Sequence, residues 1–417
     1  MLPQRSISKL CGGLSAPLLL GALLTGGTPS HMACDPGNAG LVLPSGACGT
    51  LVADDVGAVR QLAVAPNGDL YAAIADGGPG GILVLRDRNG DGKPDERASF
   101  GPVGANDVEL RGDYVYAAWS DEVRRYRLSP DGLKPSDKGE TIVRGLPAGS
   151  GHRAKSLAFG PDNVMYVSVG SATNSCQQND RSRRSPGKDP CTELERRAGI
   201  WTFSADKVGQ RFEEGRRFAT GLRNALALAT DPPNGTLYAA VHGRDQLGDN
   251  WGFSAEANAN NPGEELVRVE QGDDFGWPYC YYSNDQHKKV LAPEYGGDGV
   301  KVGRCSSAKD PLMVFPGHWA PLAMAFYHAD QFGPKYQGGL FVAFHGSWNR
   351  APLPQAGYRV VFVPFSDGRP SGQYTTFATA RSGPTDLRAS GVAVSPDGSL
   401  YISADANGKI WKVSKAR

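Results

Sequence analysis

The sequence predicts an all-β fold, a six-bladed β-propeller with long insertions on one face. Three observations lead to this prediction: a hairpin motif that occurs six times, further strand-like runs between the copies, and many turn-forming residues. The 55 glycines and 30 prolines among 417 residues suit tight turns but fall short of a low-complexity composition. A largely helical protein is therefore excluded, and the 40% of hydrophobic residues excludes a disordered chain.

Each hairpin copy consists of a short apolar strand, a turn rich in Pro, Asp, Asn or Gly, and a second apolar strand, usually with a tyrosine. The copies begin at Gln61, Asp107, Ser156, Ala225, Leu322 and Gly391. Strand-like runs such as residues 81–86 follow most copies, which makes about four strands per unit, as a propeller blade needs. A β-sandwich, the alternative fold, would not explain six copies of one hairpin.

The third, fourth and fifth units are longer than the others because they carry insertions. We place these after Ser171, after His242, and between Gly272 and Trp319. In an antiparallel blade, the start of the first strand, the end of the second and the link to the next blade lie on one face. We therefore expect the insertions to wall one end of the central channel, where loops on a rigid scaffold would form the functional site.

Residues 1–33 are predicted to be a secretory signal, with 34–417 as a single propeller domain. Arg5 and Lys9 precede an apolar run, 16–24, that is too short to span a bilayer as a helix. No other segment is apolar and long enough to cross a membrane. The near balance of 44 Lys plus Arg against 43 Asp plus Glu argues against a nucleic acid or anionic membrane as partner. We expect an exported protein, periplasmic or extracellular.

The cysteine spacing fits an oxidising compartment. Cys11 belongs to the predicted signal, and the remaining six cysteines form three sequence-local couples. Many pairings are open to six cysteines, and the simplest joins neighbours: Cys34–Cys48, Cys176–Cys191 and Cys280–Cys305. A zinc site is poorly supported, because no C-x-x-C or clustered Cys/His spacing occurs.

Arginines and histidines gather at the sequence positions that should face the channel mouth. Arg60, His152, Arg223, Asn224 and Arg388 precede first strands, whereas His242 and His345 close second strands. Any one of them could be an ordinary loop contact. Three arginines and three histidines facing one cavity would repel one another without an anionic ligand, so the set predicts a site for an anion.

A second motif resembles the beginning of a calcium-binding loop. It has the pattern D-x-N-x-D-G but has Ala98 where the loop's twelfth residue is normally Glu. A structural Ca²⁺ on the face opposite the site would be held by Asp87, Asn89, Asp91, Lys93 and Asp95, with Asp95 or Glu96 replacing the missing glutamate. The alternative is a solvated acidic turn.

Five further motifs together resemble one family. They are residues 151–162, Gly221–Asn224, Gly272–Pro278, His345–Arg350 and Gly391–Gly398. From about Val59 to Val413 the chain is similar to the soluble glucose dehydrogenase / L-sorbosone dehydrogenase family. The resemblance implies a propeller that uses pyrroloquinoline quinone (PQQ) with Ca²⁺ to oxidise the anomeric hydroxyl or aldehyde of a sugar. Electrons would pass to an external acceptor, a small redox carrier or a cytochrome.

The resemblance also implies residue roles. His152 matches the general base, Arg223 and Asn224 match groups near the quinone oxygens, and the carbonyls of Gly243 and Arg244 match donors to the cofactor's calcium. The remaining cofactor-binding set is Arg60, His242, His345, Asn349, Arg350 and Arg388.

Departures from the family pattern leave the sugar open. A carboxylate expected after the strand that ends at Val169 is replaced by Gly170-Ser171, so the sequence does not identify a partner that orients His152. Arg244 stands where proline is common. Two alternatives are a calcium-dependent lactonase-type hydrolase, which would need carboxylate and Asn side chains around a metal, and a non-catalytic binding propeller.

Overall fold

Short apolar strands joined by tight turns build six antiparallel sheets around a central channel. The structure, a computed structural model, describes residues 34–129, 133–135 and 137–416, and the predicted signal 1–33 lies outside the described residues. The innermost strands contact one another in a closed cycle, β3–β7–β11–β16–β22–β28 and back to β3. The predicted six-bladed propeller is confirmed.

Each blade has four principal strands. Blade 1 consists of β3 (Val59–Val64), β4 (Leu70–Ile74), β5 (Ile82–Arg86) and β6 (Glu96–Phe100). Blade 2 consists of β7 (Asp107–Arg111), β8 (Tyr114–Ala118), β9 (Glu122–Arg127) and β10 (Glu140–Arg144). Blade 3 consists of β11 (Leu157–Phe159), β12 (Val164–Val169), β13 (Gly199–Ser204) and β15 (Arg216–Thr220).

The other three blades follow the same order. Blade 4 consists of β16 (Ala227–Asp231), β17 (Thr236–Val241), β18 (Glu264–Val269) and β21 (Met313–Phe315). Blade 5 consists of β22 (Pro321–Tyr327), β23 (Gly339–Phe344), β24 (Arg359–Val363) and β27 (Thr375–Ala380). Blade 6 consists of β28 (Ala389–Val394), β29 (Leu400–Ala404), β30 (Lys409–Lys415) and β2 (Ala47–Ala53).

Minor elements complete the architecture. Two blades gain an edge strand, β1 (Leu41–Val42) on β27 and β14 (Gln210–Arg211) on β10. Separate hairpins are formed by β19 (Cys280–Ser283) with β20 (Lys288–Leu291), and by β25 (Phe365–Ser366) with β26 (Arg369–Pro370). Helices α1 (Leu247–Trp251) and α2 (Ala255–Asn260) are short. No helix in the described ranges has the length and apolar character that a membrane span requires.

The ring is closed by a strand from the beginning of the chain. β2 pairs antiparallel with β30, so blade 6 combines residues from both ends of the sequence. The disulfide Cys34–Cys48 ties the preceding segment to β2, and the Trp411 indole donates to the Ala39 carbonyl oxygen at 3.1 Å. The hairpin repeat alone did not reveal this closure.

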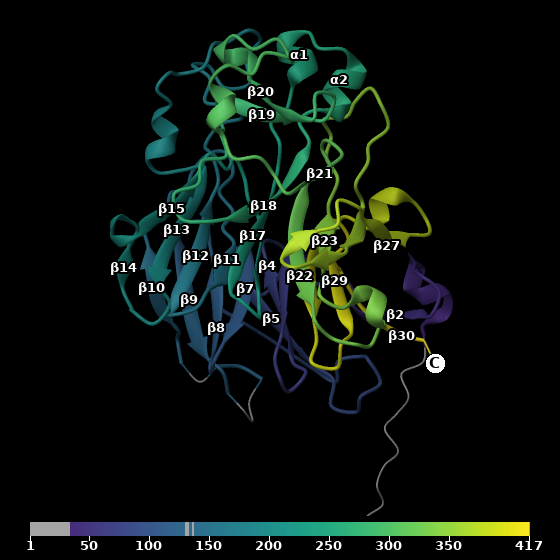
Figure 1. The fold of residues 1–417 in the computed structure, drawn as a ribbon. Helices are drawn as coiled ribbons and strands as arrows, with labels where there is room; N and C mark the ends of the chain where they lie inside the picture. Colours follow the sequence, from purple (N-terminus) through teal and green to yellow (C-terminus); the bar gives the residue numbers. More distant parts are fainter. Residues whose placement is uncertain (1–33, 130–132, 136, 417) are drawn as a thin grey trace, which may run out of the picture.

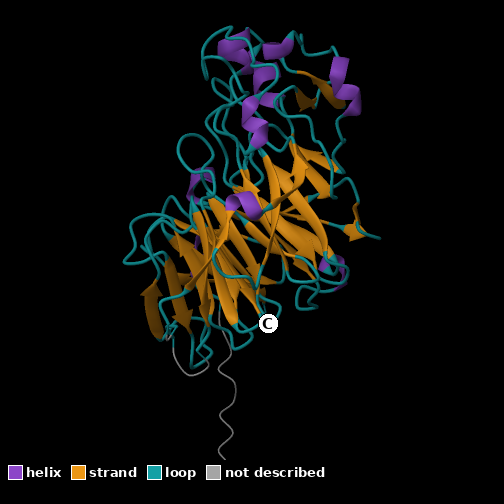
Figure 2. Cartoon of the chain, turned by 90° about the vertical axis from the view of Figure 1, so that its left-hand side faces the viewer, coloured by secondary structure: helices purple, strands orange, loops and turns teal. Residues whose placement is uncertain are grey.

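Three insertions form a layer above one end of the blades, which we call the cap (residues 171–198, 243–263 and 270–312; Figures 1 and 2). All three predicted disulfides are present, and two of them, Cys176–Cys191 and Cys280–Cys305, lie in the cap. The cap insertions are joined at Glu294, which is buried, forms an ion pair with Arg244, and accepts hydrogen bonds from Ser175 and Trp251.

The connection of the third insertion differs from the prediction. Residues 270–312 join the third and fourth strands of blade 4, not the end of one blade to the next. The chain reaches the cap by running along the outer edge of blade 3, where Thr220 bridges Asp274 and the Trp277 amide donates to the Gly221 carbonyl. This edge pairing explains how a connection from the opposite end of the blade contributes to the cap.

Candidate functional site

The channel end beneath the cap opens into a cavity with two lobes. The wide lobe, about 750 Å³, is lined by Arg60, Asn106, Trp119, Asp121, Glu122 and Arg153, among others. The narrow lobe, about 430 Å³, is lined by Arg223, Asp245, Glu264, Trp348, Gln355 and Arg388, among others. His152, His242, Ala320 and His345 line both lobes. The predicted face therefore contains a cavity with the three histidines at the junction of its lobes.

The strand ends place most of the predicted residues as expected. His242 follows β17, His345 follows β23, and Arg388 directly precedes β28. Two positions differ in detail: Arg60 lies inside β3, and His152 lies five residues before β11. Both still line the wide lobe, because the backbone before and at the start of an innermost strand faces the same channel end.

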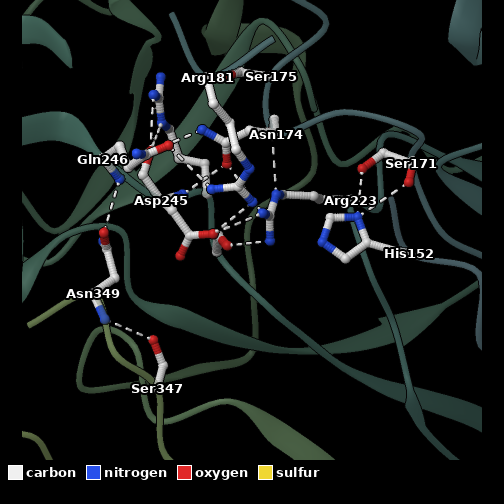
Figure 3. Close-up of polar contacts among 12 residues, drawn as sticks. His152, Ser171, Asn174, Ser175, Arg181, Arg223, Asp245, Gln246, Ser347 and Asn349 are labelled. Carbon is white, nitrogen blue, oxygen red and sulfur yellow. Dashed lines mark hydrogen bonds and ion pairs between the residues drawn. The ribbon is translucent and has the colours of Figure 1, made fainter. Parts of the chain in front are cut away.

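His152 is oriented by Ser171. Its Nδ1 lies 3.1 Å from the Ser171 carbonyl oxygen and 2.9 Å from Ser171 Oγ (Figure 3). Because Ser171 Oγ donates its own hydrogen to the Thr173 carbonyl, both Ser171 oxygens act as acceptors toward the ring. The proton therefore resides on Nδ1, which leaves Nε2 as the basic nitrogen.

The pKa of His152 is far below the ordinary value of a histidine. Burial, followed by the charges of Arg223 and His242, lowers this pKa to about 2. The ring is consequently neutral throughout the physiological pH range. Its basic form is fully available, but its affinity for a proton is weak until a negative charge comes near.

Arg223 is held in a buried polar network (Figure 3). Its Nη1 donates to the Gly243 carbonyl at 2.6 Å, and its Nη2 lies 3.1 Å from Asp245 Oδ2. Asp245 also pairs with Arg181 of the cap at 3.1 Å. Burial opposes ionisation of Asp245, but Arg223, His318 and Arg181 together lower its pKa below the usual value.

Carboxylates balance much of the predicted cationic ring. Asp405, directly after β29, lies 2.7 Å from Arg60 Nη1 and 2.9 Å from His345 Nε2. Burial also lowers the pKa of His242 to about 4, so this ring is neutral. The prediction of a ring of uncompensated cations is therefore wrong for Arg60 and Arg223.

Arg388 is the exception. Its guanidinium stacks over the Tyr358 ring at 5.2 Å. No hydrogen-bond or ion-pair partner for it is found among the described residues. Asp405 is close enough for its carboxylate to feel the charge of Arg388 but forms no direct ion pair with it. A half-buried guanidinium in a cavity wall without a direct partner is suited to an anionic ligand.

Two neighbours of Arg388 also lack partners. Gln355 Oε1 is buried on the wall of the narrow lobe without a hydrogen-bond donor, and Trp348 is 57% exposed on the same lobe. Gly346 packs directly against the Tyr358 ring in this wall, where a Cβ at position 346 would lie 2.3 Å from the ring. A planar anion with an N–H or O–H donor would satisfy the cation, the acceptor and the exposed aromatic face together.

Asn349 and Arg350 do not line either lobe. Arg350 donates to the backbone carbonyls of Ala259 and Gly317, and buried Asn349 accepts from the Gln246 amide at 3.1 Å and contacts His318. Both side chains attach the loop after β23 to the cap. The structure therefore separates them from the other predicted cofactor-binding residues.

The residues proposed to bind calcium form other interactions. The Gly243 carbonyl is bound by Arg223, and the Arg244 side chain turns into the cap toward Glu294. In the loop between β5 and β6, Asp87 accepts from the amides of Gly90 and Gly92, and Asp91 accepts from the Lys93 amide. Within the described ranges, no group of three or more His, Cys, Asp or Glu side chains is arranged to hold a metal.

Four functional residues escaped sequence reasoning: Ser171, Asp245, Glu264 and Asp405. Glu264, buried at the start of β18, accepts from the amides of Gly243 at 2.9 Å and Ala320 at 3.1 Å. Burial raises its pKa to about 7. Ser171 and Asp405 could have been found by examining the residues that follow the second strands. Glu264 could have been found at the start of a third strand, which faces the same end of the channel.

Comparison with known proteins places the chain among related propellers. A PQQ-dependent pyranose dehydrogenase from Coprinopsis cinerea is 28% identical over 267 residues, which are 52% of this chain and 35% of that protein. A PQQ-dependent sugar dehydrogenase from Hypocrea jecorina is 24% identical over 343 residues, 74% of this chain and 73% of that protein. The chain spans about half the length of an uncharacterised Borreliella burgdorferi protein that it also matches.

The solved structures agree on the fold. A calcium structure of the Trichoderma reesei carbohydrate-active enzyme of family AA12 superimposes with a TM-score of 0.75 at 21% identity, covering 90% of this chain and 97% of that one. The family model described as TrAA12-like matches residues 41–416, from the first edge strand to the end of blade 6. The family resemblance indicated by the sequence motifs is thereby confirmed, and the chain belongs to the TrAA12-like family.

Proposed function

We propose that the protein is a PQQ-dependent sugar dehydrogenase that oxidises a sugar at its anomeric hydroxyl or aldehyde. The observation that carries the proposal is the convergence of Arg388, Gln355 and Trp348, each without a partner for its free group or face, in a lobe that adjoins His152. The names of the relatives from Coprinopsis cinerea and Hypocrea jecorina support the assignment to enzymes and to sugars.

The residues present fit PQQ, which is a planar tricarboxylate with a ring N–H. Arg388 would hold a carboxylate, Gln355 Oε1 would accept from the ring N–H, and Trp348 would cover one face. When bound, PQQ supplies the two-electron acceptor of the oxidation. His242 and His345 would lie beside it as further members of the predicted binding set.

His152 performs the proton transfer in this proposal. Its Nε2, left basic by the hydrogen bonds to Ser171, takes the proton of the sugar hydroxyl. Arg223 and Asn224 lie on the same cavity, Arg223 in the narrow lobe and Asn224 in the wide lobe. The fixed positive charge of Arg223 disfavours protonation of His152 but stabilises negative charge that develops on the substrate oxygen.

Calcium is the second predicted cofactor, but the Gly243 carbonyl, predicted to bind it beside the quinone, already has another partner. A Ca²⁺ at Gly243 and Arg244 would lie beside the Arg223 guanidinium, which already donates to the Gly243 carbonyl, and the two positive charges would repel each other. We assign no catalytic step to calcium at this position. The loop at Asp87–Asp95 stays a predicted structural site.

An exported protein is part of the proposal. Three disulfides join all six cysteines outside the predicted signal, and such bonds persist in oxidising compartments. An external acceptor, either a small redox carrier or a cytochrome, would then receive the electrons outside the cytoplasm.

The decisive experiment adds PQQ, with and without Ca²⁺, to the purified protein. We expect the absorption spectrum of a bound quinone and sugar-dependent reduction of a dye acceptor. Failure to bind PQQ would contradict the proposal. Binding of PQQ with no reduction by any sugar would favour the non-catalytic binding propeller, and sugar-lactone hydrolysis without PQQ would favour the lactonase.

A further inference from the structure

We infer that the end of the channel away from the cap holds a second binding site, which takes a small primary ammonium ion with an apolar body and binds it through Glu109. The inference does not depend on the proposed function, because this site and the two lobes lie at opposite ends of the channel.

The site is a pocket of about 360 Å³ on the propeller axis, to which all six blades contribute. Its walls come from the middle and end of the innermost strands: residues 62–64, 109–110, 158–159, 228–230, 324–326 and 392–394. Because these strands start at the cap end, the pocket lies toward the other end of the channel. Its volume is sufficient for a small ligand.

A narrow waist separates this pocket from the lobes. Between them the axis retains a space of about 10 Å³, which is at the lower limit for a single water molecule. Gln61 of β3 reaches across to blade 5, where its Nε2 donates to the Leu322 carbonyl at 2.5 Å. Ser390 Oγ donates to the Val59 carbonyl at 2.7 Å. A ligand in the pocket is therefore kept apart from His152.

Glu109 gives the pocket its charge. Among the described residues that line the pocket, Glu109 alone has an ionisable side chain, and the others are apolar except for Thr230. The Glu109 side chain is half-buried, and no hydrogen-bond or ion-pair partner for its carboxylate is found in the described part of the chain. Burial, followed by the charge of Asp107, raises its pKa well above the usual value. A bound cation would stabilise the ionised form of this carboxyl group.

The basic side chains next to the pocket's two aromatic rings already have acidic partners. Arg111 stacks over one ring and pairs with Asp206 at 3.2 Å. His328 stacks on the other ring, and its Nε2 lies 2.9 Å from Asp231. Neither residue therefore supplies a free positive charge to Glu109, which leaves that role to a ligand.

The strand edges favour a primary ammonium over other cations. Each innermost strand is the last strand of its sheet, so its inner edge faces the channel with backbone carbonyls. A primary ammonium has three N–H donors, one for Glu109 and two for such carbonyls, whereas a quaternary ammonium has none. The Leu, Val, Met and Phe side chains of the walls would cover its apolar body. A metal ion would instead need several oxygen ligands.

Three ligands with the same six-carbon chain test the inference: hexylammonium, 1-hexanol and hexanoate. Calorimetric titration of the purified protein without PQQ measures the affinity of each. We expect hexylammonium to bind about tenfold or more tightly than 1-hexanol, and hexanoate more weakly than either, because only hexylammonium has a charge opposite to that of Glu109. Glu109→Gln, which keeps the shape of the side chain, should bring the affinity for hexylammonium within about threefold of that for 1-hexanol.

Two control variants and one spectroscopic signal locate the binding. Asp121→Asn in the wide lobe and Glu256→Gln on the exposed surface of the cap should leave the preference for hexylammonium unchanged. Met324 lines the pocket, so its methyl NMR signal, assigned with Met324→Leu, should shift when hexylammonium is added to the parent. This signal also decides the matter if Glu109→Gln does not fold.

Three results would overturn the inference. They are equal affinity of the parent for hexylammonium and 1-hexanol, a preference that persists in folded Glu109→Gln, and a Met324 signal that does not respond at saturating hexylammonium. PQQ should bind equally well to the parent and to Glu109→Gln. The proposed function is therefore tested separately, by PQQ binding and sugar oxidation, and either idea can fail without the other.

Discussion

The hydrogen bonds of His152 decide which of its ring nitrogens is available for chemistry. Ser171 occupies Nδ1 through two oxygens, so Nε2 is the basic nitrogen, and burial keeps the ring neutral. A serine in this place fixes the ring without adding a negative charge. The proton affinity of His152 therefore depends more on what binds in the cavity than on its orienting partner.

Replacing His152 tests its role as the base. His152→Ala should bind PQQ nearly as well as the parent, while turnover falls by about 10²–10⁴-fold because the proton acceptor is lost. The measurement is the rate of quinone reduction by sugar in PQQ-saturated protein, with melting temperature as a check on folding. His328→Ala, at a histidine that pairs with Asp231 and lines neither lobe, is the matched control. A parental rate in the loaded variant would remove His152 from the mechanism.

Arg388 and Arg350 should respond differently to the same change. Arg388→Ala should weaken PQQ binding by roughly ten- to a hundred-fold, because a charged hydrogen-bond partner in a cavity is lost. Arg350→Ala should leave PQQ affinity largely unchanged and lower stability, since its guanidinium binds backbone carbonyls. PQQ titrations of both variants, with exposed Arg381→Ala as control, decide the matter. Equal losses in affinity would show that Arg350 reaches the ligand.

His242 should make stability depend on pH. Its pKa is lowered to about 4 in the folded protein, and its Nε2 lies 2.7 Å from the Pro321 carbonyl oxygen. As pH falls below the unfolded value of about 6.5, the unfolded state takes up a proton that the native state refuses, which costs up to about 3 kcal/mol. The free energy of unfolding can be measured with urea near pH 7.5 and near pH 4.5. Between these two pH values it should fall less in His242→Gln than in the parent. Equal losses would mean that His242 titrates normally.

At the scale of elements, the hairpins were predictable and the path of the third insertion was not. The alternation of apolar residues and turns is local, and all six hairpins form as expected. The passage of residues 270–279 along β15 depends on pairing between Thr220 and Asp274, which belong to different blades. Such a contact leaves no signal in either segment alone, because edge pairing uses backbone groups that every residue carries.

The predicted calcium-binding loop between β5 and β6 can be tested as a single element. If the loop binds Ca²⁺, calcium should raise the melting temperature of the parent by stabilising the folded state. Asp91→Ala should abolish that rise and lower the basal melting temperature slightly, because Asp91 also accepts from the Lys93 amide at 2.8 Å. Thermal melts with added calcium or with a chelator measure both effects. A parent that does not respond to calcium would identify the loop as a turn held by its own hydrogen bonds.

For the whole molecule, features set by neighbouring residues were predictable from the sequence, whereas most contacts between distant residues were not. The sequence predicted the propeller, the face of the site, the disulfides and the position of His152 at the channel mouth. It did not predict the counter-charges Asp245 and Asp405, since these lie far along the chain from some of the cations that they pair with. It also placed Asn349 and Arg350 on the cavity, although the loop that carries them turns toward the cap.

The closure of blade 6 has a consequence for the order of assembly. In five blades the four principal strands come from one continuous stretch, but the sixth needs β2, which lies far from β30 in sequence. Until these strands pair, β30 presents a bare edge that can recruit a strand from another molecule. By covering this edge, β2 shields the last sheet from aggregation, and the Cys34–Cys48 disulfide fixes the segment before β2 to the strand.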